Sequence, residues 1–225
     1  MSTTEELKAL HEKWFANCTC ELKKTATQPV PGDGNPNAEI VFIGEAPGKN
    51  EDLEGRPFVG AAGKFLAEML ESINMKRENI YITNIVKYRP PNNRDPEPSE
   101  KDACRAWLHD ELALIRPKLI VFLGRHSMND FFPDLRISLV HGKLVHKKFP
   151  NIRAEYFLPL YHPAAALYNG GMRETLADDF KKIPLILKKI AEGKTAESEE
   201  PAEKVPPKIL EEKSKEKEAV QEALF

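Results

Sequence analysis

Residues 40–48, with the sequence IVFIGEAPG, decide the fold class of this chain of 225 residues. Four apolar residues are followed at once by a turn that contains two glycines and a proline, which is typical of the end of a buried strand. The same arrangement recurs at residues 156–164, YFLPLYHPA, where an apolar run ends at a histidine and a proline. Ligands of open α/β sheets bind beyond the carboxyl ends of the strands. The two stretches therefore predict a ligand site at one edge of a sheet.

Apolar runs alternate with helical patterns along the rest of the chain. Strands are expected at residues 39–43, 79–86, 119–123 and 155–160. Helices are expected at residues 5–15, along the apolar stripe of residues 65–73, at residues 99–115 with Ser99 as N-cap, and at residues 172–191, where Pro184 should kink the helix or delay its start. Strands that alternate with helices form parallel sheets through right-handed crossovers. We therefore predict a three-layer α/β/α sandwich around a central four-stranded, mostly parallel sheet.

Charge is distributed unevenly, although the formal net charge is only −2. Residues 193–225 contain six lysines and nine glutamates, which predicts a disordered charged tail after one folded domain at residues 1–192. The domain is nearly neutral, so a DNA-binding face would have to be a local patch. The polar, acidic start of the chain and its short apolar runs predict a cytoplasmic protein without a membrane segment. Three cysteines do not indicate a disulfide framework.

Three side chains stand where a site is expected. Asn84 ends the segment YITN (residues 81–84) of the second expected strand, His162 follows the fourth strand, and Phe58 lies between glycines in residues 55–60, GRPFVG. Each also has an ordinary structural explanation: a strand-end amide bonded to local backbone, a turn histidine and a core aromatic. An asparagine nevertheless presents a donor and an acceptor side by side, which suits the edge of a planar base.

Four separate segments together resemble the family-4, iron–sulfur type uracil-DNA glycosylases. They are residues 44–52 (GEAPGKNED), 55–60 (GRPFVG), 81–87 (YITNIVK) and 162–167 (HPAAAL). The resemblance covers about residues 18–190 and is specific, because the motifs agree in both sequence and spacing. It implies a monofunctional enzyme of base excision repair that flips uracil out of DNA, hydrolyses the N-glycosidic bond and leaves an abasic site.

The resemblance also implies which residues bind the base. Phe58 would stack on the flipped uracil, and Asn84 would read its edge by accepting from N3–H and donating to O4. His162 would donate to uracil O2, helped by backbone N–H groups of the turn that contains Gly44 and Ala46. Uracil-containing DNA is thus the implied partner, and a monomer is expected.

The sequence identifies the group that positions the attacking water less clearly than it identifies the residues that bind the base. Other branches of the superfamily carry Asp or Asn at the position of Ala46, whose methyl group cannot act on water. Glu45 or Glu51 is therefore the candidate, and the sequence does not decide between them.

Two segments are expected to touch DNA. Lys87, Arg89 and Arg94 supply three cations on a proline-stiffened loop, which favours phosphate contacts over a merely solvated loop. Leu167 and Tyr168 follow the histidine motif and could enter the duplex where the base leaves, or else pack against the domain.

The cysteines match the family's iron–sulfur site incompletely. Cys20 and Cys104 occupy two of the four implied positions, Cys18 is displaced by one residue from the position held by Asn17, and Tyr88 stands at the remaining one. A four-iron cluster normally takes four thiolates, whereas this chain offers at most three. The cluster is therefore either absent or a labile three-cysteine version with an outside fourth ligand. We expect it to be absent or unstable, and we expect no requirement for a dissolved metal ion.

The last residues, 221–225 (QEALF), resemble the short peptides with which archaeal replication and repair proteins bind the sliding clamp. A disordered tether that ends in an apolar hook suits such recruitment, because the hook orders on binding. The alternative is a chance match over five residues.

Two other functions compete with uracil excision. One is a damage-binding protein that keeps the pocket without turnover, and the other is a glycosylase for a different base, such as mismatched thymine or hypoxanthine. A nucleotide-binding protein is a third interpretation, and it fails because the turn lacks Gly-x-Gly spacing and a P-loop lysine.

Overall fold

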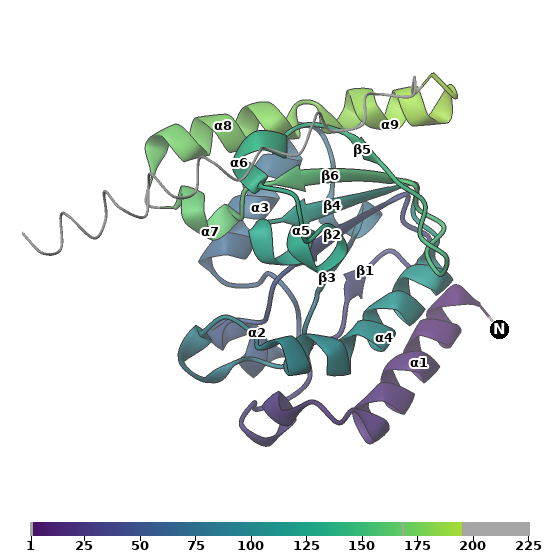
Figure 1. Ribbon diagram of the computed structural model, residues 1–225, viewed down its shortest axis with the longest axis vertical. Helices are drawn as coiled ribbons and strands as arrows, with labels where there is room; N and C mark the ends of the chain where they lie inside the picture. Colours follow the sequence, from purple (N-terminus) through teal and green to yellow (C-terminus); the bar gives the residue numbers. More distant parts are fainter. Residues whose placement is uncertain (1, 168, 195–225) are drawn as a thin grey trace, which may run out of the picture.

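The computed structural model describes residues 2–167 and 169–194 (Figure 1). Tyr168, nearly all of the expected tail and its clamp-binding peptide at residues 221–225 lie outside the described residues. Across the described ranges, no helix is long and apolar enough to cross a membrane.

A sheet with the strand order β1-β3-β2-β4-β6-β5 forms the middle layer. Its strands are β1 (Asp33–Gly34), β2 (Ile40–Gly44), β3 (Tyr81–Asn84), β4 (Leu119–Leu123), β5 (Val145–His146) and β6 (Tyr156–Leu160). The four central strands run parallel, whereas the two-residue strands β1 and β5 pair antiparallel at the edges. The predicted four-stranded parallel sheet is confirmed as the centre of the fold, and the edge strands extend it.

Helices cover both faces of this sheet, as predicted for a three-layer sandwich (Figure 1). The α-helices are α1 (Thr3–Asn17), α2 (Lys49–Glu54), α3 (Ala61–Ser72), α4 (Pro98–Ile115), α5 (Arg125–Phe131), α6 (Ile137–Val140), α7 (Pro163–Ala166), α8 (Gly170–Phe180) and α9 (Ile183–Ala191). Short 3-10 helices lie at Glu21–Lys24, Arg77–Asn79 and Pro91–Asn93.

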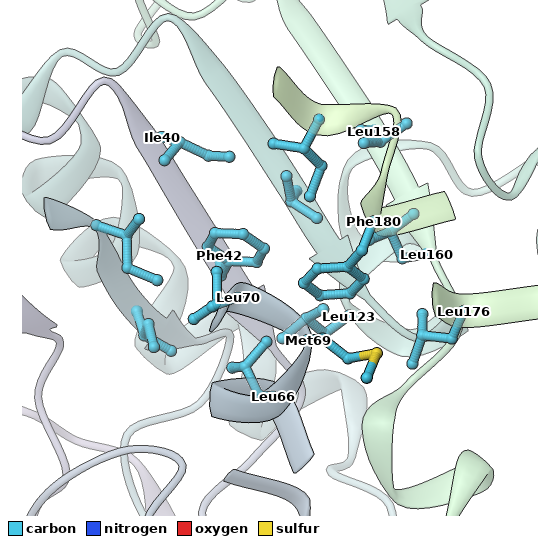
Figure 2. Packing of buried hydrophobic residues seen from close by; sticks show 14 of the residues in the cluster. Ile40, Phe42, Leu66, Met69, Leu70, Leu123, Leu158, Leu160, Leu176 and Phe180 are labelled. Carbon is cyan, nitrogen blue, oxygen red and sulfur yellow. The ribbon is translucent and has the colours of Figure 1, made fainter. Parts of the chain in front are cut away.

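Successive side chains of each strand point to opposite faces of the sheet, and this divides the buried apolar residues into two hydrophobic cores. In β2, Ile40 and Phe42 join a core with α3, α8 and α9, whereas Val41 and Ile43 join a core with α1, α4 and α5. Figure 2 shows the first core, where the rings of Phe42 and Phe180 stack with centroids 6.1 Å apart. Because β2 is buried on both faces, its sequence is continuously apolar rather than alternating.

Two helix boundaries differ from the prediction. Helix α4 begins at Pro98 with Glu97 rather than Ser99 as N-cap, because the carboxylates of Glu97 and Glu100 bond reciprocally to backbone N–H groups. The single helix expected at residues 172–191 is two helices. Pro184 lies in the first turn of α9, where its missing N–H removes no intrahelical hydrogen bond.

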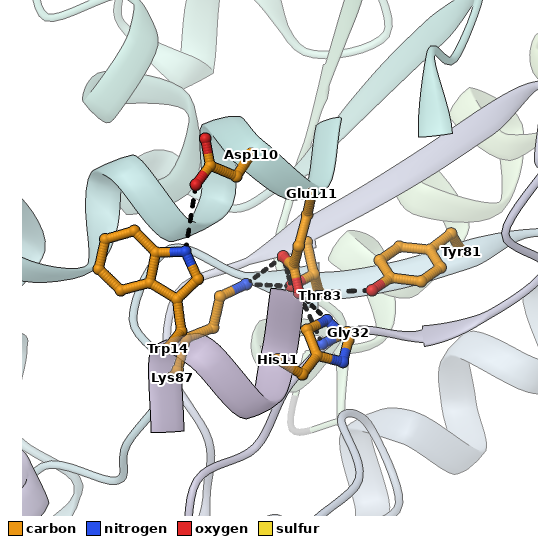
Figure 3. A network of polar contacts seen from close by, with 8 residues as sticks. All are labelled: His11, Trp14, Gly32, Tyr81, Thr83, Lys87, Asp110 and Glu111. Atoms are coloured by element: carbon orange, nitrogen blue, oxygen red, sulfur yellow. Dashed lines mark hydrogen bonds and ion pairs between the residues drawn. The ribbon is translucent and has the colours of Figure 1, made fainter. Parts of the chain in front are cut away.

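A fully buried carboxylate ties the helical layer to β3 (Figure 3). Glu111 on α4 accepts hydrogen bonds at Oε1 from His11 Nε2 at 3.0 Å and from the backbone N–H of Gly32 at 3.0 Å. At Oε2 it accepts from Thr83 Oγ1 at 3.0 Å and from Lys87 Nζ at 2.5 Å. Burial by itself would raise the pKa of Glu111, but Lys87 and His11 outweigh it and lower this pKa to about 2.

This network corrects the predicted DNA contact of Lys87. The Lys87 side chain is fully buried, and its ammonium group donates to both Glu111 and Thr83. A charge that is desolvated and paired inside the domain is not presented to a phosphate. Lys87 is therefore a structural residue of the α4–β3 interface.

Replacing Glu111 by Gln should destabilise the domain strongly. The substitution leaves the Lys87 ammonium buried without a carboxylate, which typically costs about 3–5 kcal/mol in the free energy of unfolding. Glu39→Gln is the matched control, because Glu39 pairs with Lys118 on the surface and its loss should cost under about 1 kcal/mol. Urea unfolding measures both, and equal effects of the two substitutions would contradict the account of this network.

Candidate active site

The site lies where the central parallel strands end. Gly44 is the last residue of β2, and it lies beside Asn84, the last residue of β3, in the strand register. Gly124 follows β4, and Tyr161 and His162 follow β6. The topology thus brings Gly44, Asn84 and His162 to one edge of the sheet, as the sequence predicts.

The side chains of Asn84 and Phe58 both lie close to Gly44. A Cβ atom at this position would lie 2.4 Å from Asn84 Oδ1 and 2.7 Å from the ring of Phe58. Contacts this short are not tolerated, so the absence of a side chain at Gly44 is what lets the amide and the ring approach each other.

Phe58 is held in a strained backbone conformation. Its φ is +54°, in the left-handed region that is unfavourable for a bulky residue. The guanidinium of Arg77 donates to the carbonyl oxygens of Pro57, at 2.5 Å, and Phe58, at 3.1 Å. Gly63 admits this backbone, because a Cβ there would lie 1.9 Å from Phe58 O. The surroundings therefore impose the strain and fix the ring, as is typical of functional sites.

Glu51 supports the same loop. Its Oε1 accepts hydrogen bonds from the backbone N–H groups of Val59, at 2.9 Å, and Gly60, at 2.8 Å. Its carboxylate is thus bonded to the two residues that follow Phe58, and the geometry gives Glu51 a part in shaping the aromatic wall.

Asn84 presents an unsatisfied acceptor at this edge of the sheet. The residue is only 2% exposed, and within residues 2–167 and 169–194 its Oδ1 has no hydrogen-bond partner. A buried polar atom without a partner is uncommon and calls for an explanation. A ligand that carries an N–H group would satisfy this oxygen.

His162 is oriented as a neutral donor. Its Nδ1 accepts the backbone N–H of Ala164 at 3.1 Å, so in the neutral ring the proton is on Nε2. Burial, together with a smaller effect of His126, lowers the pKa of His162 to about 4. The imidazole stacks against Phe58 with ring centroids 5.8 Å apart. At neutral pH the site therefore contains an uncharged N–H donor beside the Phe58 ring.

Glu45 lies in the turn that directly follows β2. Its side chain is 23% exposed. Burial, reinforced by the nearby Asp95, raises the pKa of Glu45 to about 7. Such a carboxylate can take up a proton near neutral pH, which is what a general base requires. Ala46, the next residue, packs against an aromatic cluster below the turn.

The structure does not test the expected DNA contacts of Arg89, Arg94 and Leu167. Arg94 forms two hydrogen bonds with the carboxylate of Glu100, at 2.8 and 2.6 Å, so its charge is already paired. Arg89 donates from Nε to Asn93 Oδ1 at 2.8 Å. Leu167 is partly buried against the core that contains Phe58. These three contacts stay predictions.

The three cysteines gather with Tyr88 and Trp107 in the buried cluster against which Ala46 packs. All of these thiols are free in the described part of the chain. Tyr88 is 1% exposed. Burial, reinforced by the negative charge of nearby thiolates and by contact with Cys18, raises the pKa of Tyr88 above its usual range, so a phenolate is disfavoured. Three cysteines and a neutral phenol supply one thiolate too few for a four-thiolate cluster.

The chain belongs to the uracil DNA glycosylase superfamily, whose family model matches residues 31–184. Among its relatives, a type-4 uracil-DNA glycosylase of Sulfurisphaera tokodaii is 48% identical over 80% of this chain and 84% of that protein. Proteins with the same name from Archaeoglobus fulgidus and Thermotoga maritima are 52% and 38% identical, over 73% and 84% of this chain and 84% and 99% of theirs. These matches place the chain in the type-4 family, which confirms the resemblance.

Adding a methyl group at Gly44 should disable the pocket. In Gly44→Ala the new Cβ displaces the Asn84 amide or the Phe58 ring, and we expect uracil release to fall by more than about tenfold, the loss expected when one transition-state contact is misplaced. Gly170→Ala is the control, because no described atom lies within 4 Å of a Cβ at that position. Single-turnover rates of the two variants decide the matter, and full activity of Gly44→Ala would contradict the pocket geometry.

Proposed function

We propose that this pocket holds a uracil flipped out of DNA and hydrolyses its N-glycosidic bond, leaving an abasic site. Membership of the type-4 family and the names of three relatives support the reaction. The observation that carries the proposal is the buried Asn84 Oδ1, for which the described chain supplies no donor. Uracil N3–H supplies one, whereas cytosine has an unprotonated N3 and would leave the oxygen unpaired. Unpaired buried polar groups make such sites strongly selective.

The remaining residues of the site stabilise the charges that develop on uracil and on the sugar as the bond breaks. Cleavage moves the electron pair of the C1′–N1 bond onto uracil N1, and the sugar becomes cation-like. His162 donates from Nε2–H to uracil O2 and stabilises the anion, together with backbone N–H groups of residues 44–48. Phe58 stacks on the ring. A water molecule then forms the new C1′–O bond and gives its proton to Glu45.

We assign the role of positioning the attacking water and accepting its proton to Glu45 rather than to Glu51. Oε1 of Glu51 accepts the backbone N–H groups of Val59 and Gly60, which ties this side chain to the loop that holds Phe58. Glu45 follows the strand end directly, and its raised pKa suits proton uptake. The geometry supports this choice between two candidates that the sequence leaves open.

The pH dependence of uracil release tests this assignment. Glu45 must be ionised to accept the proton, and its pKa is about 7, so the rate should fall about tenfold per pH unit below that value and level off above it. His162 adds no dependence in this range, because with a pKa of about 4 it is already neutral. The measurement is single-turnover release of free uracil from an oligonucleotide that contains one uracil.

Glu45→Gln should remove this acid limb and lower the plateau rate by about 10²-fold or more, the usual contribution of a general base. An acid limb that persists in Glu45→Gln would show that another group titrates, and would overturn the assignment.

We further propose that the chain carries no stable four-iron cluster and needs no dissolved metal ion. The donor set of Cys18, Cys20, Cys104 and Tyr88 supports the first statement, and a mechanism that needs only protein side chains supports the second. Protein purified without oxygen should contain less than about one iron per chain and show no visible absorbance from iron–sulfide charge transfer. A full complement of iron with matching acid-labile sulfide would contradict this expectation, whereas Tyr88→Cys should increase iron binding.

Recruitment of the enzyme is a separate proposal. Residues 1–192 serve as the catalytic domain of a monomer, and residues 193–225 serve as a charged tether whose last five residues bind the sliding clamp. The composition of the tail and its QEALF ending support this arrangement.

A further inference from the structure

A histidine that the mechanism does not yet use faces Glu45. His126 lies in the first turn of α5, immediately after Gly124 and Arg125 at the end of β4. Its Nδ1 is 3.9 Å from Glu45 Oε1. The sequence offered one signal for it, namely that charged residues directly follow the glycine at the carboxyl end of a central strand.

The neighbours of His126 define its tautomer. Arg125 donates from Nε to His126 Nε2 at 3.0 Å, and a guanidinium can only donate. Asp95 Oδ2 also lies near this nitrogen, at 3.2 Å, and it pairs with the same guanidinium at 3.8 Å. Because Nε2 accepts the hydrogen bond from Arg125, the proton of the neutral ring is on Nδ1, the nitrogen that faces Glu45. Burial lowers the pKa of His126, which keeps the ring neutral at neutral pH.

The backbone of His126 is fixed by its neighbours in the chain. Ser127 is fully buried, and its Oγ donates to the carbonyl oxygen of Gly124 at 3.1 Å. Met128 is buried in the core between the sheet and α4. The imidazole is thus presented to the Glu45 turn from a rigid element.

We propose that His126 is a positioning residue for Glu45: its Nδ1–H holds Oε1, so that Oε2 is directed at the attacking water. This inference rests on the proposed role of Glu45. The 3.9 Å separation is longer than a hydrogen bond, and hydrogen bonds of active sites commonly tighten when substrate binds.

The charges around Glu45 and His126 predict in which direction each substitution should shift the pKa of Glu45. Glu45 is influenced by Asp95, Lys101 and Arg125, and His126 is influenced by the same three groups. Asp95 Oδ2 lies 3.2 Å from His126 Nε2, and its charge opposes ionisation of Glu45. Removing the His126 donor should therefore raise the pKa of Glu45, whereas removing the charge of Asp95 should lower it.

The experiment compares pH profiles of single-turnover uracil release. His126→Leu should lower the plateau rate by about tenfold, the scale of one lost catalytic hydrogen bond, and move the acid limb to higher pH, with unchanged affinity for uracil-containing DNA. His126→Gln keeps an N–H donor and should retain more of the rate. Asp95→Asn should move the acid limb to lower pH.

His109→Leu is the matched control. Burial also lowers the pKa of His109, and this histidine likewise has an arginine and an aspartate nearby, Arg105 and Asp130. It packs against Phe131 rather than facing Glu45. The control should keep both the rate and the acid limb, and thermal unfolding verifies that each variant is folded.

A double substitution separates failure of this inference from failure of the assigned base. If His126 acts through Glu45, adding His126→Leu to Glu45→Gln should slow the reaction no further. An independent tenfold loss in that background would overturn the positioning role, as would a His126→Leu enzyme with the wild-type rate and profile. Wild-type activity of Glu45→Gln would instead overturn the assignment of the base itself.

Discussion

The buried carboxylate of Glu111 is the interaction on which the rest of the structure depends. It receives hydrogen bonds from α1, from the loop at Gly32 and from three side chains close to Asn84 in the sequence, namely Tyr81, Thr83 and Lys87. Desolvating such a charge is costly, so it is stable only when every donor is in place. The network therefore fixes the end of β3, and with it the Asn84 amide that we propose to read the base.

The proposed uracil site depends on the close packing of Asn84 and Phe58 at Gly44. Gly44 leaves room for Asn84 and Phe58 to meet, and Glu51 and Arg77 keep Phe58 in a backbone conformation that it would not adopt freely. The result is a preorganised site, with a neutral donor, an aromatic wall and an unsatisfied acceptor in place before any base enters. Preorganisation of this kind is the usual source of transition-state stabilisation.

The central strands and the convergence of Asn84 and His162 could be predicted, because continuous apolar runs mark buried parallel strands and strand ends share one edge. Lys87 could not, because a lysine after a strand looks like a surface residue until Glu111, on a distant helix, is known to face it. The choice between Glu45 and Glu51 needed the backbone donors of the Phe58 loop. Helices as short as α2 and α5 carry too few turns for a periodic signal.

The measurement that tests the central claim most directly is release of free base by Asn84→Ala and by the wild-type protein, on matched oligonucleotides with uracil or cytosine at one position. The account predicts that the wild-type protein releases uracil and no cytosine, and that Asn84→Ala loses more than about tenfold of the uracil rate, the scale of one lost transition-state contact. Binding of uracil-containing DNA without release, or an unchanged rate in Asn84→Ala, would contradict it.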